Sequence, residues 1–122
     1  MNENIFISIV IPSLNQGKFI SRCIDSILQQ SFDSFEIIII DSFSVDDTDK
    51  IIKQYLRKIK KKLIYVKKKS GQAEAINYGF QIAKGNFLAF QAADDYYLEG
   101  SFEKFYSFSK KNNQANIIYG NL

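Results

Sequence analysis

Two adjacent carboxylates, Asp94 and Asp95, follow an apolar stretch of strand length at residues 87–91. If that stretch is a buried strand, the pair emerges at its carboxyl end, which is where ligands bind in an open α/β sheet. Neighbouring negative charges repel each other, and a hard divalent cation would relieve the repulsion. Taken alone, the pair is explained more simply as a solvated turn or a helix N-cap. The choice between this structural role and a metal site depends on the other motifs of the chain.

Polar side chains also follow two other apolar runs. Ser13 and Asn15 come after a β-branched run, and Asp41 comes directly after four consecutive isoleucines. The carboxyl ends of parallel strands meet at one edge of a sheet, so three such clusters predict a crevice site there.

The elements that would position these residues alternate along the chain. Their pattern predicts an α/β fold with a doubly wound, mostly parallel sheet, helices on both faces and about five strands. Apolar runs of strand type cover residues 5–11, 35–40, 63–66, 87–91 and 115–119, and helical spacing covers residues 18–28, 51–59, 72–83 and 102–109.

Three local signals predict where these elements end. Pro12 should stop the first strand, because proline cannot donate a hydrogen bond to a ladder. Ser44 and Asp47 have the spacing of a capping box before the second helix. Lys84-Gly85 has the composition of a helix C-cap.

The composition limits the chemistry and the location. A chain of 122 residues forms one domain, and the absence of histidine leaves carboxylates as acid–base groups and metal ligands. Cys23 is the single cysteine, lies on an apolar helical face and fits a reducing compartment. No apolar run spans a membrane and no signal segment is visible, so we expect a cytoplasmic protein. A basic stretch at residues 50–69 leaves open an association with the inner membrane face.

Several other functions fit poorly. The glycine-rich dinucleotide fingerprint and the P-loop are both missing. A receiver-like phosphoacceptor domain needs an acidic pair after the first strand, where this chain has Pro12-Ser13-Leu14. Nucleic-acid binding is not expected, because the aromatic residues do not interleave with the basic stretch.

Together the motifs resemble those of family 2 glycosyltransferases of the GT-A fold. The resemblance covers nearly the whole chain and keeps the family's order of motifs. It rests on four segments, residues 9–15 (IVIPSLN), 40–48 (IDSFSVDDT), 71–79 (GQAEAINYG) and 92–95 (AADD).

The resemblance implies a nucleoside-diphosphate sugar as donor, with a UDP-sugar favoured, and Mg²⁺ or Mn²⁺ as cofactor. It also implies a glycan or lipid-linked acceptor and inversion at the sugar. Asp41 would contact the base or ribose, and Asp94 would bind the metal that bridges the diphosphate, with Asp95 as a second ligand or a helix cap. The other donor-binding residues implied are Pro12, Ser13, Asn15, Gln72, Asn77 and Ala93.

The chain departs from the family pattern in ways that bear on function. Ala92 stands where the family has the first carboxylate of its D-x-D motif. Ser42 and Phe43 replace residues that are usually small or acidic, and Phe43 could narrow the pocket. The family's acceptor site and general base lie in the half that would follow residue 122. We therefore expect an N-terminal nucleotide-sugar-binding part that, alone, binds the donor weakly or not at all and does not turn over, with a non-catalytic nucleotide-binding domain as the alternative.

Overall fold

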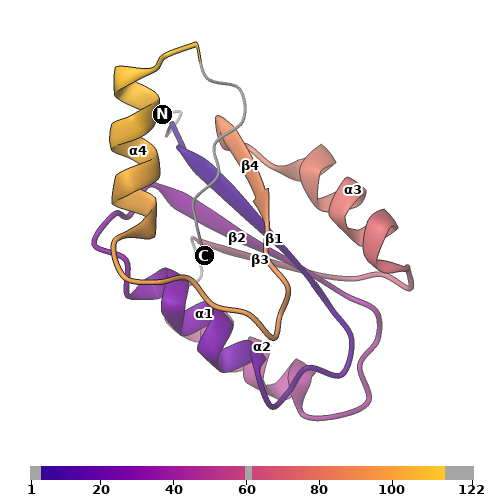
Figure 1. Ribbon diagram of the computed structural model, residues 1–122. Coiled ribbons are helices and arrows are strands. Elements are labelled where there is room, and N and C mark those ends of the chain that lie inside the picture. Colours follow the sequence, from indigo (N-terminus) through magenta and orange to yellow (C-terminus); the bar gives the residue numbers. More distant parts are fainter. Residues whose placement is uncertain (1–3, 60–61, 115–122) are drawn as a thin grey trace.

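The computed structural model describes residues 4–59 and 62–114, in which strands and helices alternate along the chain (Figure 1). The strands are β1 (Ile7–Ser13), β2 (Phe35–Asp41), β3 (Leu63–Lys67) and β4 (Phe87–Phe90). The helices are α1 (Ile20–Leu28), α2 (Thr48–Lys58), α3 (Gln72–Ile82) and α4 (Ser101–Lys111). No helix of the described residues is both long and apolar enough to cross a membrane.

The strands form one parallel sheet in the order β3-β2-β1-β4. β1 lies between β2 and β4, with Ile7 opposite both Phe35 and Phe87. This sheet confirms the predicted α/β class, and its strand count is close to the prediction. The fifth strand predicted at residues 115–119 lies outside the described residues.

Helices cover both faces of the sheet, as predicted (Figure 1). Side chains on one face, including Ile9 and Ile37, pack with α1, α2 and α4. Side chains on the other face, including Val10 and Ile38, pack with α3. β1 and β2 are therefore buried on both sides, which explains why their sequences are continuously apolar instead of alternating.

The prediction that Pro12 ends the first strand was wrong, because β1 continues to Ser13. The carbonyl of Val10 accepts a hydrogen bond from the Gln91 amide, so Val10 and Pro12 both direct their backbone polar groups toward β4. β4 pairs with β1 only as far as Phe90, opposite Val10. The missing N–H of Pro12 therefore falls beyond the end of the ladder and removes no bond from it.

The predicted capping box does not form. α2 begins at Thr48, and the side chain of its N-cap residue, Asp47, makes no capping hydrogen bond. The hydroxyl of Ser44 bonds to Asp41 instead. Asp46 is the residue that accepts a hydrogen bond from the Thr48 amide, at 3.0 Å.

Gly85 has a different role from the predicted helix cap. α3 ends at Ile82, followed by Ala83 in an extended conformation, and Gly85 does not have a positive φ. A Cβ at residue 85 would lie 2.6 Å from the hydroxyl oxygen of Ser8. That hydroxyl accepts the Gly85 amide hydrogen at 2.8 Å and donates to the buried carboxylate of Glu36 at 2.6 Å. Glycine is therefore needed here for close approach to β1.

Candidate functional site

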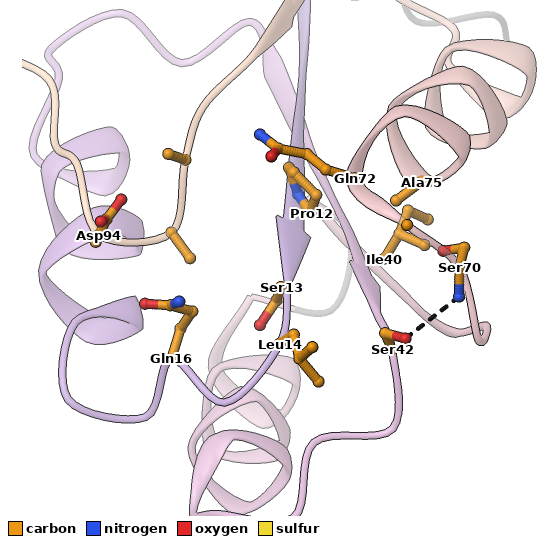
Figure 2. Close-up of a pocket in the computed structure, with 13 residues that line it drawn as sticks. Pro12, Ser13, Leu14, Gln16, Ile40, Ser42, Ser70, Gln72, Ala75 and Asp94 are labelled. Carbon is orange, nitrogen blue, oxygen red and sulfur yellow. Dashed lines mark hydrogen bonds between the residues drawn. The ribbon is translucent and has the colours of Figure 1, made fainter.

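A pocket of about 450 Å³ opens at the carboxyl edge of the sheet, where the sequence places its polar clusters (Figure 2). Its walls come from the ends of β1 and β2, from the segment that enters α3 and from the segment that follows β4. The lining residues are Pro12, Ser13, Leu14, Gln16, Ile40, Ser42, Ser70, Gly71, Gln72, Ala75, Ala92, Ala93 and Asp94.

The structure brings some of the predicted site residues together and leaves others out. Those that line the pocket are Pro12, Ser13, Gln72, Ala93 and Asp94. Those that do not line it are Asn15, Asp41, Asn77 and Asp95, of which all but the buried Asp41 are exposed to solvent. Phe43 is also absent from the pocket wall and does not narrow it; its side chain is 57% exposed.

Ser13 presents an unusual polar atom to the pocket. The residue is 6% exposed, and its Oγ is buried without a hydrogen-bond partner in the described structure. Buried hydroxyl groups are normally paired, because an unpaired one loses its hydrogen bonds to water without replacement. Ser13 lines the pocket, so a molecule bound there would lie beside a hydroxyl that has no partner within the described protein.

Asp41 does not line the pocket, but its hydrogen bonds fix the loops that do. It is 1% exposed, and its two carboxylate oxygens accept hydrogen bonds from the Ser44 amide at 2.8 Å and the Ser44 hydroxyl at 2.6 Å. The Ser44 oxygen in turn accepts the Asn15 amide hydrogen at 2.8 Å. Asp41 thus connects the loop after β2 to the loop after β1.

Further hydrogen bonds join the same two loops. The side-chain oxygen of Asn15 accepts the Val45 amide hydrogen at 2.8 Å, and the Gln16 amide donates to the Thr48 hydroxyl at 3.1 Å. Asn15 and Phe43 both have φ near +54°, a conformation that is costly for a bulky residue and persists where surrounding contacts impose it. This bonding fixes the backbone that carries Leu14 and Gln16 in the pocket wall.

The loop before α3 is attached to the same framework. The Ser42 amide donates to the Ser13 carbonyl at 2.9 Å, and the Ser42 hydroxyl accepts the Ser70 amide hydrogen at 3.2 Å (Figure 2). The Lys68 amide bonds to the Asp41 carbonyl at 2.9 Å. Ser70 and the residues after it are therefore held against the end of β2.

Cys23 lies behind the segment that carries Asp94 and is buried, as predicted. Its sulfur is 3.7 Å from the carbonyl oxygen of Ala92. Burial raises the pKa of the Cys23 thiol to about 12, and the nearby charges of Asp95 and Asp94 add to that rise. The thiol is therefore protonated at neutral pH and is not a nucleophile of the site.

The donor groups in the pocket fit one kind of metal site. Asp94 is the carboxylate that lines it, and the described part of the chain contains no cluster of three or more His, Cys, Asp or Glu residues that could hold an ion. Magnesium is commonly bound by one or two carboxylates together with substrate phosphates and water. The pocket therefore fits a cation that arrives with a diphosphate, and does not fit an ion held by protein groups alone.

The sequence matches a family model described as glycosyl transferase family 2 over residues 8–121, which is nearly the whole chain. The chain belongs to glycosyl transferase family 2. This family membership confirms the resemblance drawn from the four sequence motifs. It also removes the receiver-like alternative.

Curated relatives of this family 2 chain are named as glycosyltransferases. Glycosyltransferase GlyG of Streptococcus pneumoniae is 30% identical over 94% of the chain and 38% of its own length. The poly(ribitol-phosphate) beta-glucosyltransferase of Bacillus spizizenii is 35% identical over 95% of the chain and 19% of its own length. The chain therefore spans less than half of each of these relatives.

Solved structures share the fold of this family 2 chain. Staphylococcus aureus TarS 1-349, in complex with UDP-GlcNAc, matches with a TM-score of 0.83 and 24% identity over 89% of the chain and 32% of TarS. The mannosyltransferase PcManGT of Pyrobaculum calidifontis, in complex with GDP-Man and Mn²⁺, matches with a TM-score of 0.70 and 22% identity over 78% of the chain and 29% of PcManGT. At these identities the comparison establishes a GT-A-like fold.

The sequence analysis missed part of the pocket wall. Leu14 lies within the first motif, and Gln16 and Ser70 lie one residue outside the first and third motifs, but nothing in their residue types singles them out. Ile40 and Ala75 read as core residues, because apolar residues at strand and helix spacing usually are. Ile40 and Ala75 line the pocket because α3 lies close to the end of β2. The pattern of residue types does not predict the distance between these two elements.

Proposed function

We propose that the chain binds the donor of a sugar-transfer reaction, a nucleoside-diphosphate sugar, in the pocket at the carboxyl edge of the sheet. A UDP-sugar is the favoured donor. The proposal is supported by family membership and by the nucleotide sugars in the complexes of TarS and PcManGT. The walls formed by Leu14, Ala75 and Gln72 offer an apolar surface beside polar groups, which suits a base and a ribose.

The unpaired hydroxyl of Ser13 is the observation that carries this proposal. A buried polar atom in a pocket wall favours a ligand that supplies its missing hydrogen bond. A nucleotide base or ribose has donors and acceptors of this kind. Pro12 and Gln72 line the same pocket and would lie near the nucleotide. Asp41 and Asn15 would then act by shaping the loops, and not by the direct contact that the family resemblance implies.

Asp94 is the residue proposed to hold a divalent cation, Mg²⁺ or Mn²⁺, together with the diphosphate. Such a cation supplies charge stabilisation for a departing nucleoside diphosphate. Asp95 lies outside the pocket wall, and its amide bonds to the Ala92 carbonyl at 3.0 Å, which favours a structural role for its turn. Because Ala92 carries no carboxylate, the cation would depend on Asp94 and on the ligand.

For the whole protein we propose transfer of the sugar, with inversion, to a glycan or lipid-linked acceptor. The relative from Bacillus spizizenii is named for transfer to poly(ribitol phosphate), which makes a cell-surface polymer a reasonable acceptor class. The acceptor site and the general base are proposed to lie beyond residue 122, so the 122 residues alone should bind the donor at best weakly and not turn over. A cytoplasmic location completes the proposal, and the basic composition of residues 50–69 leaves open an association with the inner membrane face.

Calorimetry with UDP, with and without Mn²⁺, tests the donor site. Ser13→Ala should weaken UDP binding about fivefold under both conditions, as the loss of one hydrogen bond of about 1 kcal/mol requires. Asp94→Ala should remove the gain in affinity that Mn²⁺ gives and leave metal-free binding unchanged. Ser107→Ala, at an exposed position on α4, is the matched control.

Two results would refute the assignment. Wild-type protein that fails to bind UDP at millimolar concentration contradicts the donor site. Equal Mn²⁺ dependence in wild type and Asp94→Ala contradicts the role of Asp94. Sugar transfer by the 122-residue chain would disprove the proposal that the general base lies beyond it.

A further inference from the structure

The segment between β4 and α4, residues 91–100, contains neither a helix nor a strand, yet it carries Asp94. It runs alongside α1 on its way to α4 (Figure 1). A segment of this kind has no backbone ladder to fix its position, so its side-chain partners decide where the Asp94 carboxylate lies.

Besides the Cys23 sulfur, which lies 3.7 Å from the Ala92 carbonyl oxygen, three polar side chains of the α1 region supply those partners. Arg22 and Ser26 lie one helical turn apart on α1, and Gln30 follows four residues later, just after the helix ends. Residues four apart lie on the same face of a helix, so Arg22 and Ser26 point toward the same neighbour. That neighbour is the segment from residue 91 to residue 100.

Arg22 makes the contact nearest to the pocket. Its guanidinium donates a hydrogen bond to the carbonyl oxygen of Asp94 at 3.2 Å, and it lies 4.6 Å from the centre of the Tyr96 ring. The Arg22 side chain is exposed to solvent, so its role in the core is small. These contacts hold the Asp94 backbone and the Tyr96 side chain, on either side of Asp95, against α1.

Ser26 and Gln30 hold the remainder of the segment. The Ser26 hydroxyl accepts the Tyr97 amide hydrogen at 2.9 Å and donates to the Cys23 carbonyl at 2.7 Å. The Gln30 amide group donates to the carbonyls of Leu98 and Ser26, both at 3.0 Å, and its oxygen accepts the Phe102 amide hydrogen at 3.3 Å. Both side chains are buried, so each bond replaces contacts with water that are lost on folding.

We propose that Arg22, Ser26 and Gln30 are positioning residues that hold the Asp94 carboxylate at the mouth of the pocket. They touch neither the pocket nor the ligand proposed for it; they act through the backbone of residues 94–102. The inference rests on the metal-binding role proposed for Asp94. Residues that orient a metal ligand typically change metal affinity by about 10- to 100-fold when they are replaced.

Hydrogen–deuterium exchange tests the anchoring without any ligand. Ser26→Ala removes the acceptor of the Tyr97 amide, and Arg22→Met removes the contact with the Asp94 carbonyl while keeping the aliphatic stem. Both variants should exchange the hydrogen-bonded amides of Asp95 and Tyr97 about tenfold faster than wild type, with unchanged exchange in β1 and β2. Arg57→Met, at an exposed arginine of α2 for which the described structure shows no ion pair, is the matched control.

Calorimetry on the same variants tests the consequence for the site. Arg22→Met should lower the affinity for UDP in Mn²⁺ about tenfold and leave metal-free UDP binding unchanged, whereas Arg57→Met should bind like wild type. Exchange at residues 91–100 that equals wild type in both variants would overturn the anchoring. Faster exchange with unchanged Mn²⁺-dependent affinity would overturn the positioning role.

One further outcome separates this inference from the proposed function. If wild-type protein binds UDP with no dependence on Mn²⁺, Asp94 does not bind a metal. The positioning role proposed for Arg22, Ser26 and Gln30 is then wrong as well. If wild type shows the dependence and Asp94→Ala loses it, but Arg22→Met and Ser26→Ala keep it in full, the positioning role alone is wrong.

Discussion

Gly79 of α3 packs directly against Val10 of β1, because a Cβ at residue 79 would lie 2.5 Å from Cγ1 of Val10. Gly79→Ala should therefore force α3 away from the sheet. Overpacking of this kind costs about 1–3 kcal/mol, and the better helix propensity of alanine offsets about 1 kcal/mol. We expect a net loss of up to about 2 kcal/mol in the free energy of unfolding, measured by urea denaturation.

A double-mutant cycle isolates that overlap. Val10→Ala removes the two methyl groups that a Cβ at residue 79 would meet. On this background Gly79→Ala should be neutral or stabilising, because the contact that opposes it is gone. An equal loss of stability in both backgrounds would show that the overlap is not the cause.

Ser44→Ala should destabilise the protein although Ser44 is only half-buried. The variant removes the hydroxyl that donates to the buried carboxylate of Asp41 and accepts from the Asn15 amide. Leaving a buried carboxylate with one partner fewer costs about 1–3 kcal/mol. Urea denaturation measures the loss, with Ser107→Ala as the control, and a change below about 0.5 kcal/mol would contradict the network.

Acid should destabilise the protein partly through Asp49. Its carboxylate lies 2.9 Å from Lys67 Nζ, accepts the Tyr65 hydroxyl at 2.7 Å and lies 3.0 Å from Lys53 Nζ. These contacts, that with Lys67 above all, hold the pKa of Asp49 below its usual range. Because the folded-state pKa is the lower one, the stabilisation is complete above the unfolded-state pKa, near 4, and is lost as the pH falls below it.

Asp49→Asn should accordingly be less stable than wild type at pH 7 and lose less stability between pH 5 and pH 3. Urea midpoints across this range measure both effects. Because the partners are partly exposed to solvent, added salt should reduce the difference at pH 7. If the urea midpoints of wild type and Asp49→Asn fall equally between pH 5 and pH 3, the Asp49 carboxylate does not stabilise the folded protein.

The thiol of Cys23 should be unreactive in the folded protein. It is fully buried, and burial raises its pKa to about 12, so almost no thiolate forms at pH 8. Ellman's reagent should modify it at least about 100-fold more slowly in buffer than in 6 M guanidinium. Rapid modification of one thiol per folded chain would be inconsistent with this burial.

The sequence was most informative where a pattern has one physical explanation. Four isoleucines in succession at residues 37–40 predict a strand buried on both faces, because the apolar run is of strand length and β-branched residues favour strands. Asp94 follows from its place after an apolar run, and the structure puts it in the pocket wall. Local periodicity and position relative to the sheet edge were sufficient for these features.

Contacts between distant parts of the chain were not predictable in the same way. The bond from Gln30 to the Leu98 carbonyl joins residues 68 positions apart, and a glutamine after a helix gives no sign of it. Ser44 has the spacing of a capping box, but its hydroxyl donates a hydrogen bond to the buried carboxylate of Asp41 and does not cap α2. Gly85 resembles a cap in sequence, whereas its need for glycine comes from the approach of β1.

The parallel order of the sheet has a consequence for how the protein folds. β1 can pair with β2 as soon as about 40 residues are available, because Ile7 lies opposite Phe35. Its pairing with β4 joins Ile7 to Phe87 and closes a loop of 80 residues (87 − 7). Contacts across long loops form late, because their closure entropy must be overcome first. During synthesis, the half of the sheet that carries Asp41 should therefore form before the strand that delivers Asp94.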